Sequence, residues 1–456
     1  MEALIVIFLS GLISLFVAFA KKPMYVLATA CTGLISGAIL LINQWNTPST
    51  LFTNYKGLEF SHTSIAYSLV AILFTFLAIL AGYKSFKDEL EHTGDYVALY
   101  IFSLTGAICM LSFTDMFMFF LGLEILSIPI YVLAGTRKKD IRSSEASLKY
   151  FLMGAFATGI LLFGIAWIYG ATKSFDLNTI AMVIDGEAKH SSLLFIGILL
   201  MLSAFLFKVG AAPFHFWSPD VYDGSPSIVT GFMASVVKLA AFGAFMKLFG
   251  TYFTGLHDFW APALMVMAIV TMFIGNLSAL SQVKFKRLLA YSSITHVGYA
   301  LLTILSKDPM NEMNLLFYLF SYGFSVIALI TISMILNDEE DRLEAFKGLA
   351  KRSPFLGFVA ILALLSLAGV PPLVGFFGKY LVFSSVFVQY PTLVIIAIVN
   401  SGIGIYYYLK TVMTVVSKEE TSENTAVLSV SGLQWFVLFV CALGLLFGGC
   451  FTTCLG

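Results

Sequence analysis

The chain has 456 residues, of which 59% are hydrophobic and 11% are charged, and its mean hydropathy is +0.92. An ordinary soluble domain carries about 25% charged residues, so this composition excludes a soluble protein and favours one that lies in lipid. The 26 basic and 26 acidic residues cancel, which leaves no basic excess for the phosphates of nucleic acid and excludes nucleic acid as a partner.

Apolar segments long enough to cross a membrane follow one another along nearly the whole chain. A membrane-spanning helix needs about 20 mostly apolar residues, and the sequence predicts about fourteen such spans. They cover 2–20, 24–43, 64–83, 95–112, 114–134, 147–170, 192–217, 225–249, 260–280, 287–305, 313–336, 355–383, 393–416 and 430–449. Most connections are short, so we expect an all-α polytopic membrane protein with a single transmembrane domain over residues 1–456.

Basic residues are distributed unevenly between the connecting loops. The odd-numbered loops hold seventeen Lys and Arg residues, whereas the even-numbered loops hold four. Because positively charged loops stay in the cytoplasm, we expect the odd loops there and both termini on the periplasmic or outer side. An even number of spans also requires both termini on one side, so the two expectations agree.

Four charged residues fall deep inside predicted spans: Glu124, Lys208, Lys238 and Lys379. A charge at the middle of a bilayer costs at least about 2.5–3.5 kcal/mol, so these residues must face the bundle interior, pair, or lie beside water. Three lysines share one carboxylate, which does not suit a set of structural salt bridges. Because a buried amine gives up its proton readily, the surplus of lysines predicts a proton-conducting path.

Two predicted spans contain helix-breaking prolines close to these lysines. Span seven carries Pro213 after Gly210, and span twelve carries Pro371 and Pro372 after Gly369. Proline removes a helical hydrogen bond, and a broken helix at membrane depth is tolerated only inside protein or next to water, as at the ion sites of transporters. We therefore predict that helices seven and twelve are broken.

The two breaks share the pattern Gly-x-x-Pro and lie five spans apart. Because five is odd, a repeated five-helix unit re-enters the membrane upside down. We expect two inverted repeats, spans four to eight at residues 95–249 and spans nine to thirteen at residues 260–416. The lysines do not follow the repeat, because Lys208 precedes its proline and Lys379 follows its own.

Two histidines inside the spans, His215 and His296, are further candidates for proton transfer. His215 lies two residues after Pro213, and His296 ends the polar run YSSITH at 291–296. Histidine titrates near neutral pH and can pass protons, although a histidine in a span can equally be a hydrogen-bonded core residue. The sequence contains no nucleotide-binding fingerprint and no Cys/His ligand pattern, so we expect no cofactor and no metal in this chain.

Three tracts of the sequence are similar to a known family. They are LFKVGAAPFHFWSPDVY at 206–222, KRLLAYSS at 286–293 and AGVPPLVGFFGK at 368–379. Together they resemble the antiporter-like, proton-pumping membrane subunits of respiratory complex I, the NADH-quinone oxidoreductase, and the likeness is strongest to the subunit N branch. The resemblance extends over nearly the whole chain.

The resemblance implies a role for each buried charge. Glu124 on span five matches the family glutamate that pairs with the lysine of span seven, here Lys208. Lys238 matches the central relay lysine, and Lys379 matches the residue of span twelve that exchanges protons with the outer side. The family further implies that NADH, FMN, iron–sulfur clusters and quinone reside in other subunits, that the partners are other membrane subunits of complex I, and that the chain lies in the inner membrane.

Two other functions remain open on the sequence alone. A subunit of a multisubunit cation/proton antiporter shares the fold and the set of buried charges, but a sodium site would need more buried oxygen ligands. A membrane scaffold without pumping activity would not need four buried charges, since each one costs stability. A proton-translocating subunit is therefore the function that we expect.

Overall fold

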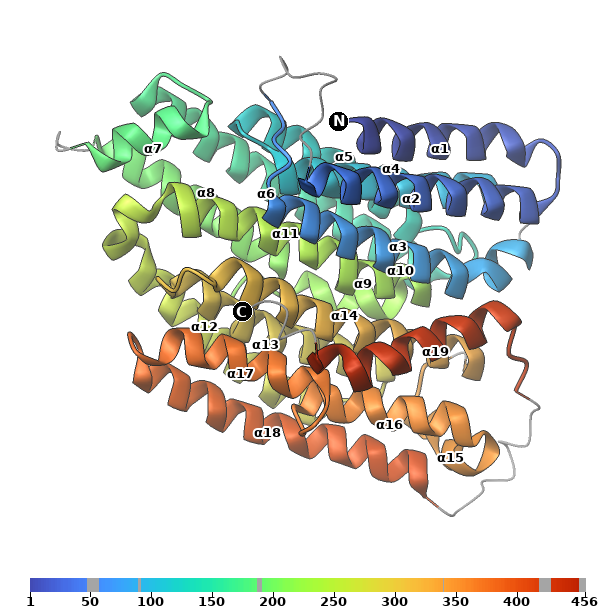
Figure 1. The fold of residues 1–456 in the computed structure, drawn as a ribbon. Helices are drawn as coiled ribbons and strands as arrows, with labels where there is room; N and C mark the ends of the chain where they lie inside the picture. The colour runs from blue at the N-terminus through green and yellow to red at the C-terminus, as the bar shows by residue number, and fades with distance from the viewer. Residues whose placement is uncertain (47–56, 89–91, 187–190, 339, 418–427, 451–456) are drawn as a thin grey trace. The chain divides into compact units, whose positions relative to one another are not determined.

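The computed structural model describes residues 1–46, 57–88, 92–186, 191–338, 340–417 and 428–450. The helices labelled in Figure 1 belong to two compact units of the chain. Unit 1 comprises Met1–Ile79, Tyr83–Val209 and Val236–Leu264, and unit 2 comprises Leu80–Gly82, Gly210–Ser235 and Met265–Gly456. The end of predicted span seven, residues 210–217, therefore groups with unit 2.

Unit 1 consists of apolar helices that pack mainly against their neighbours in sequence. The α1–α2 and α4–α5 pairs make extensive contacts, and so do the helices α6 and α8. The helices are α1 (Glu2–Ala18), α2 (Pro23–Asn46), α3 (His62–Asp88), α4 (Thr93–Ser112), α5 (Met116–Ala134), α6 (Ile141–Thr172), α7 (Leu177–Asp185), α8 (Ser192–Val209) and α11 (Lys238–Phe245). A π-helix, Met246–Tyr252, and a 3-10 turn, Thr254–Leu256, follow α11.

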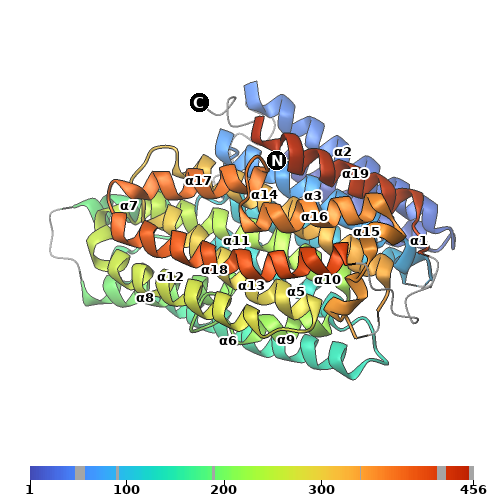
Figure 2. The same ribbon diagram turned by 90° about the horizontal axis from the view of Figure 1, so that it is seen from below.

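Unit 2 contains the later helices, in which α14 packs against α16, α17 and α19. Helices α17 and α18 lie side by side in both views (Figures 1 and 2). The helices are α9 (Trp217–Gly224), α10 (Ser227–Phe232), most of α12 (His257–Leu280), α13 (Phe285–Leu305), α14 (Asn311–Leu336), α15 (Leu349–Arg352), α16 (Pro354–Ala368), α17 (Val374–Phe387), α18 (Pro391–Val416) and α19 (Gly432–Phe447). A π-helix, Met233–Val237, joins α10 to α11, and a 3-10 turn, Leu343–Phe346, precedes α15.

Side chains that accept hydrogen bonds mark where several helices begin. Asp115 Oδ1 accepts from the backbone N–H of Met118 at 2.7 Å at the start of α5. Ser431 and Gln434 form a capping box at the start of α19. Such caps satisfy backbone N–H groups that have no partner within the helix, so the apolar runs begin as helices at defined residues.

The two expected helix breaks are present, and both begin with the same backbone conformation. Helix α8 ends at Val209 and helix α16 ends at Ala368. The next residue in each case is a glycine with positive φ, Gly210 at +77° and Gly369 at +80°, a conformation that glycine adopts without the strain of a Cβ. The backbone N–H groups of Gly369 and Val370 donate to the carbonyl oxygens of Leu365 and Ser366 in the last turn of α16, as in a Schellman C-cap.

The fold class is confirmed, because the predicted spans lie on helices and the chain is an all-α membrane protein. The span count of fourteen stays a prediction. Within the residues that the structure describes, twelve helical stretches are long and apolar enough to cross a membrane, whereas α1, α16 and α17 are shorter apolar helices. The single domain over 1–456 and the inverted repeats at 95–249 and 260–416 also stay predictions.

Candidate functional site

Lys208 and Glu124 belong to unit 1 and lie on helices α8 and α5. Lys208 stands in the last turn of α8, where a cation is favoured by the partial negative charge of the helix C-terminus. Its Nζ donates to Ser127 Oγ at 2.5 Å, and Ser127 Oγ donates to the Leu123 carbonyl oxygen at 2.5 Å. Ser127 thus fixes the ammonium on α5.

Glu124 is near enough to Lys208 to act on it electrostatically. Within the part of the chain that the structure describes, however, no ion pair within 4.0 Å joins the two side chains. Glu124 and Ser127 are three residues apart, so they share a face of α5. The sequence identified the carboxylate on this face but missed the serine that contacts the ammonium.

Lys238 is the first residue of α11 and is only 6% exposed. It directly follows the π-helix Met233–Val237, and a second π-helix, Met246–Tyr252, follows α11. A π-helical turn is rare and occurs frequently at functional sites. The sequence placed Lys238 in a continuous span and gave no sign of this change in helix type.

Lys379 lies in unit 2, where it contacts the break in predicted span twelve. Its side chain is 6% exposed, and its Nζ donates to the carbonyl oxygen of Ala368 and to Ser401 Oγ, each at 3.0 Å. The ammonium also lies over the ring of Tyr299, 5.3 Å from the centroid. Ala368 is the last residue of α16, the first half of the broken span. The Lys379 ammonium therefore donates to a carbonyl oxygen at the C-terminus of this half-helix.

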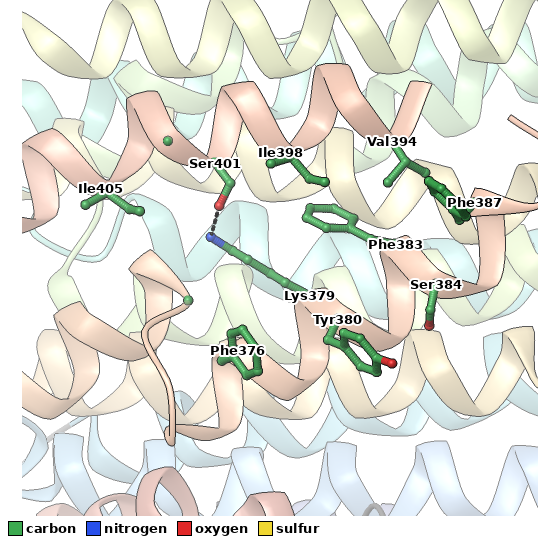
Figure 3. Close-up of a pocket in the computed structure, with 12 residues that line it drawn as sticks. Phe376, Lys379, Tyr380, Phe383, Ser384, Phe387, Val394, Ile398, Ser401 and Ile405 are labelled. Atoms are coloured by element: carbon green, nitrogen blue, oxygen red, sulfur yellow. Dashed lines mark hydrogen bonds between the residues drawn. The ribbon is translucent and has the colours of Figure 1, made fainter. Parts of the chain in front are cut away.

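A groove of about 610 Å³ opens between α17 and α18 next to this ammonium (Figure 3). Lys379 and Ser401 form its polar part, and Phe376, Phe383 and Ile398 are among its apolar walls. The apolar walls surround the charged group with a medium of low dielectric constant, in which a charge is costly and a neutral amine is not.

His296 lies in a chain of hydrogen bonds formed by three helices of unit 2. Its Nδ1 is 2.6 Å from the hydroxyl of Tyr318 on α14, and its Nε2 is 3.1 Å from the hydroxyl of Tyr408 on α18. The Tyr408 hydroxyl is also 2.5 Å from Ser292 Oγ. The His296 and Tyr299 rings are in T-shaped contact, and the Lys379 ammonium lies over the Tyr299 ring. The structure thus brings His296 and Lys379 into contact with the same tyrosine.

His215 is buried at 6% exposure in the segment between α8 and α9, where Ala212 and Pro213 precede it. The backbone N–H of Ala212 donates to Thr271 Oγ1 at 3.0 Å, which ties the break to α12. Within the described ranges His215 Nδ1 is buried and has no hydrogen-bond partner. The structure places His215 in unit 2, and its Nδ1 makes no hydrogen bond to the candidate lysines, Glu124 or His296.

The prolines Pro213, Pro371 and Pro372 lie in the two breaks, as expected. The described residues contain no group of three or more His, Cys, Asp or Glu side chains that could hold a metal ion. The polar contacts of the site are therefore made by lysine, histidine, tyrosine and serine side chains and by backbone carbonyl groups.

Comparison with known proteins assigns the chain to a family. Residues 114–404 match the model of the NADH:quinone oxidoreductase/Mrp antiporter transmembrane family. A protein of Cytophaga hutchinsonii named NADH-quinone oxidoreductase subunit N is 41% identical over 431 residues, which are 93% of this chain and 92% of that protein. Its namesake in Flavobacterium psychrophilum is 36% identical over 93% of both chains.

Solved structures agree with this assignment. A chain of respiratory complex I from Thermus thermophilus superposes with a TM-score of 0.83 at 30% identity and covers 99% of this chain and 97% of its own length. A chain of the Mrp complex from a Dietzia species has a TM-score of 0.84 at 21% identity and covers 100% of this chain and 96% of its own, which shows a shared fold alone. The chain therefore belongs to the NADH:quinone oxidoreductase/Mrp antiporter transmembrane family, and within it to the subunit N branch.

Proposed function

We propose that this chain is a proton-translocating membrane subunit of an NADH-quinone oxidoreductase. In this proposal, electron transfer from NADH to quinone in other subunits supplies the energy, and Glu124, Lys208, Lys238 and Lys379 carry the protons. His215 and His296 are further members of the relay. The relatives at 41% and 36% identity, both named as subunit N of this enzyme, support the proposal.

The observation that carries the proposal is the set of partners of Lys379. Its Nζ contacts a carbonyl oxygen, a hydroxyl oxygen and an aromatic ring, and none of these groups is charged. Among the residues that the structure describes, no carboxylate lies within ion-pair distance of it. When this lysine loses its proton, no unpaired counter-charge remains in the bundle, and the neutral amine can still donate to the same oxygens.

The proposed coupling between sites is electrostatic. Two unit charges about 8 Å apart interact by about 2 kcal/mol at an effective dielectric constant of about 20. An energy of that size changes the proton affinity of a group by more than tenfold. Moving one proton therefore suffices to load or unload a neighbouring lysine, and the chain needs no redox group of its own. NADH, FMN, iron–sulfur clusters and quinone belong, in this proposal, to other subunits.

The chain is proposed to lie in a bacterial inner membrane, in contact with other membrane subunits of the same complex. A cation/proton antiporter remains a less favoured alternative. The Mrp chain shares the fold at 21% identity, whereas the subunit N relatives share up to 41% identity over almost the full length. A scaffold without pumping activity does not explain why Lys379 is buried among neutral partners.

Replacing Lys379 by arginine tests the proposal. Arginine keeps the positive charge and the hydrogen-bond donors, but it does not release its proton in proteins. We expect K379R to assemble into the complex while NADH-driven proton pumping in inverted vesicles falls by about a hundredfold or more, as for a lost proton-transfer group. The matched control is Lys410→Arg, because Lys410 lies on the exposed side of α18. If K379R pumps like K410R, Lys379 has a structural role and the proposal fails.

A further inference from the structure

Four buried side chains of unit 2 form an unbroken chain of hydrogen bonds. Ser292 and His296 stand four residues apart on one face of α13, Tyr408 comes from α18 and Tyr318 comes from α14. Each is at most 6% exposed. The distances are 2.5 Å from Ser292 Oγ to the Tyr408 hydroxyl, 3.1 Å from there to His296 Nε2, and 2.6 Å from His296 Nδ1 to the Tyr318 hydroxyl.

The chemistry of these four side chains allows their hydrogen bonds to run in either of two directions. A hydroxyl carries one hydrogen and can also accept one, and a neutral imidazole carries one N–H and one free lone pair. In the first direction Ser292 donates to Tyr408, Tyr408 donates to Nε2, and Nδ1–H donates to Tyr318. In the second direction each of these hydrogen bonds is reversed, and the imidazole is in its other tautomer.

Passing one proton converts the first arrangement into the second. A hydronium ion gives its proton to Ser292 Oγ and becomes water, while the Ser292 hydrogen moves to the Tyr408 oxygen and the Tyr408 hydrogen moves to Nε2. The Nδ1 hydrogen moves to the Tyr318 oxygen, whose own hydrogen, directed at the His296 carbonyl oxygen at 3.4 Å, passes to a water molecule and makes it hydronium. One bond to hydrogen forms for each one that breaks, so no group keeps a net charge. The hydrogen bonds must then return to the first direction before these four side chains can pass a second proton the same way.

We propose that Tyr408 and Tyr318 carry the proton into and out of His296, so that the imidazole transfers one proton per reorientation of the chain. The proposal rests on the proposed function, because it takes His296 as a member of the relay. It adds Tyr408, a residue of α18 that no sequence pattern singled out. In the described part of the chain Tyr408 joins Ser292 to His296, so the transfer depends on its hydroxyl.

The neighbouring Tyr407 supplies a matched control within the same helix. Tyr407 is as well buried as Tyr408, but its hydroxyl donates to Asn276 Oδ1 at 3.1 Å. The Asn276 amide donates in turn to the Asn400 carbonyl oxygen at 2.8 Å. Carboxamides and backbone groups hold their hydrogens too firmly to act as a relay, so this second network orders the helices without conducting protons.

The experiment compares Tyr408→Phe, Tyr318→Phe and Tyr407→Phe with His296→Gln, each in the complete assembled complex. Two quantities are measured in inverted vesicles, the protons pumped per NADH oxidised and the effect of D2O on turnover. We expect Y408F and Y318F to lower coupled pumping by about a hundredfold, as for a lost proton-transfer group, and to increase the D2O effect. A purely structural loss would lower turnover without changing the D2O effect. Y407F is expected to behave like the unmodified complex.

The outcomes separate this inference from the proposed function. If H296Q stops pumping while Y408F and Y318F behave like Y407F, the two phenols carry no proton and the inference is overturned, although the role of His296 stands. If H296Q itself leaves pumping unchanged, the relay through His296 and the inference both fail. If the Y408F complex does not assemble, Ser292→Ala replaces it, because this variant removes the hydrogen bond between Ser292 and Tyr408 and keeps every aromatic side chain. The pumping and the D2O effect of S292A are then compared with those of Y407F.

Discussion

At the scale of single residues, the buried lysines of this chain are held in two different ways. Lys286 on α13 is 2% exposed, and its Nζ forms an ion pair with Asp341 Oδ2 at 2.8 Å while donating to the carbonyl oxygens of Asp223 and Ser225. If Lys286 lost its proton, the half-buried Asp341 carboxylate would lose its ion-pair partner. Lys379 has neutral partners instead. Lys286 therefore holds elements together, whereas Lys379, with its neutral partners, is the lysine that we propose exchanges a proton.

We predict that Lys208 needs the hydrogen bond to the Ser127 hydroxyl for its function. Ser127→Ala removes the acceptor that lies 2.5 Å from the Lys208 ammonium. A hydrogen bond to a charged group contributes about 1.5–3 kcal/mol, so we expect coupled turnover to fall by roughly tenfold. Ser127→Thr should restore most of it. Ser203→Ala, which removes a hydroxyl bonded within α8 to Leu199, serves as the control. Equal turnover of S127A and S203A would contradict the assignment.

The sequence predicts the buried charges well and their hydroxyl partners poorly, for a physical reason. A charge in lipid costs several kcal/mol, so Glu124, Lys208, Lys238 and Lys379 are conspicuous in apolar runs. A serine or tyrosine in a span costs little, because its hydroxyl can bond the backbone of its own helix. Only the packing of α5 against α8, or of α13 against α18, reveals which hydroxyls meet the charges.

At the scale of helices, the two breaks are more alike in the structure than in the sequence. Lys208 precedes Pro213 in the chain, and Lys379 follows Pro372. Yet Lys208 stands in the last turn of α8, and Lys379 reaches back to the last carbonyl group of α16. Both lysines therefore lie at the C-terminus of the first half-helix, where the helix dipole and freed carbonyl groups favour a cation. The sequence could not indicate this, because Lys379 arrives there by tertiary folding.

Gly369 is predicted to be essential at its break. Its φ of +80° costs an ordinary residue about 1–2 kcal/mol, and a Cβ at this position would lie 2.9 Å from Cδ of Lys379. We expect Gly369→Ala to lower both the thermal stability of the complex and its pumping, because the lysine must move. Gly402→Ala is the control, since a Cβ there meets open space and alanine favours a helix. If G369A is as stable and active as G402A, the break does not position Lys379.

Helix type was predicted less well than helix position. Hydropathy locates the spans because lipid demands long apolar runs, and glycine and proline locate the breaks. The π-helices at Met233–Val237 and Met246–Tyr252 have no comparable signal. A π-turn is one extra residue accommodated by neighbouring helices, so it depends on packing rather than on composition.

At the scale of the whole molecule, the fold alone does not decide the function. The chain superposes about equally well on complex I and on the Mrp complex, with TM-scores of 0.83 and 0.84. Because a fold can host several activities, sequence identity separates the two possibilities: the subunit N relative of Cytophaga hutchinsonii is 41% identical, whereas the Mrp chain is 21% identical.

The orientation in the membrane is predicted from seventeen basic residues in odd loops against four in even loops. In a variant without native cysteines, Lys138→Cys should react with a membrane-impermeant maleimide only in inverted vesicles. Lys173→Cys should react only from the opposite side, in right-side-out preparations. The reverse pattern of labelling would place both termini in the cytoplasm and contradict the predicted topology.

The measurement that tests the central claim most directly is NADH-driven acidification of inverted membrane vesicles that carry Lys208→Ala. Assembly of the complex is checked on a native gel, and Lys149→Ala, which removes an exposed lysine paired with Glu145, is the control. If this chain moves protons, K208A assembles, but pumping and coupled NADH–quinone turnover fall by about tenfold or more, while K149A retains both. If vesicles with assembled K208A complex acidify like those with K149A, Lys208 does not carry protons and the account is contradicted.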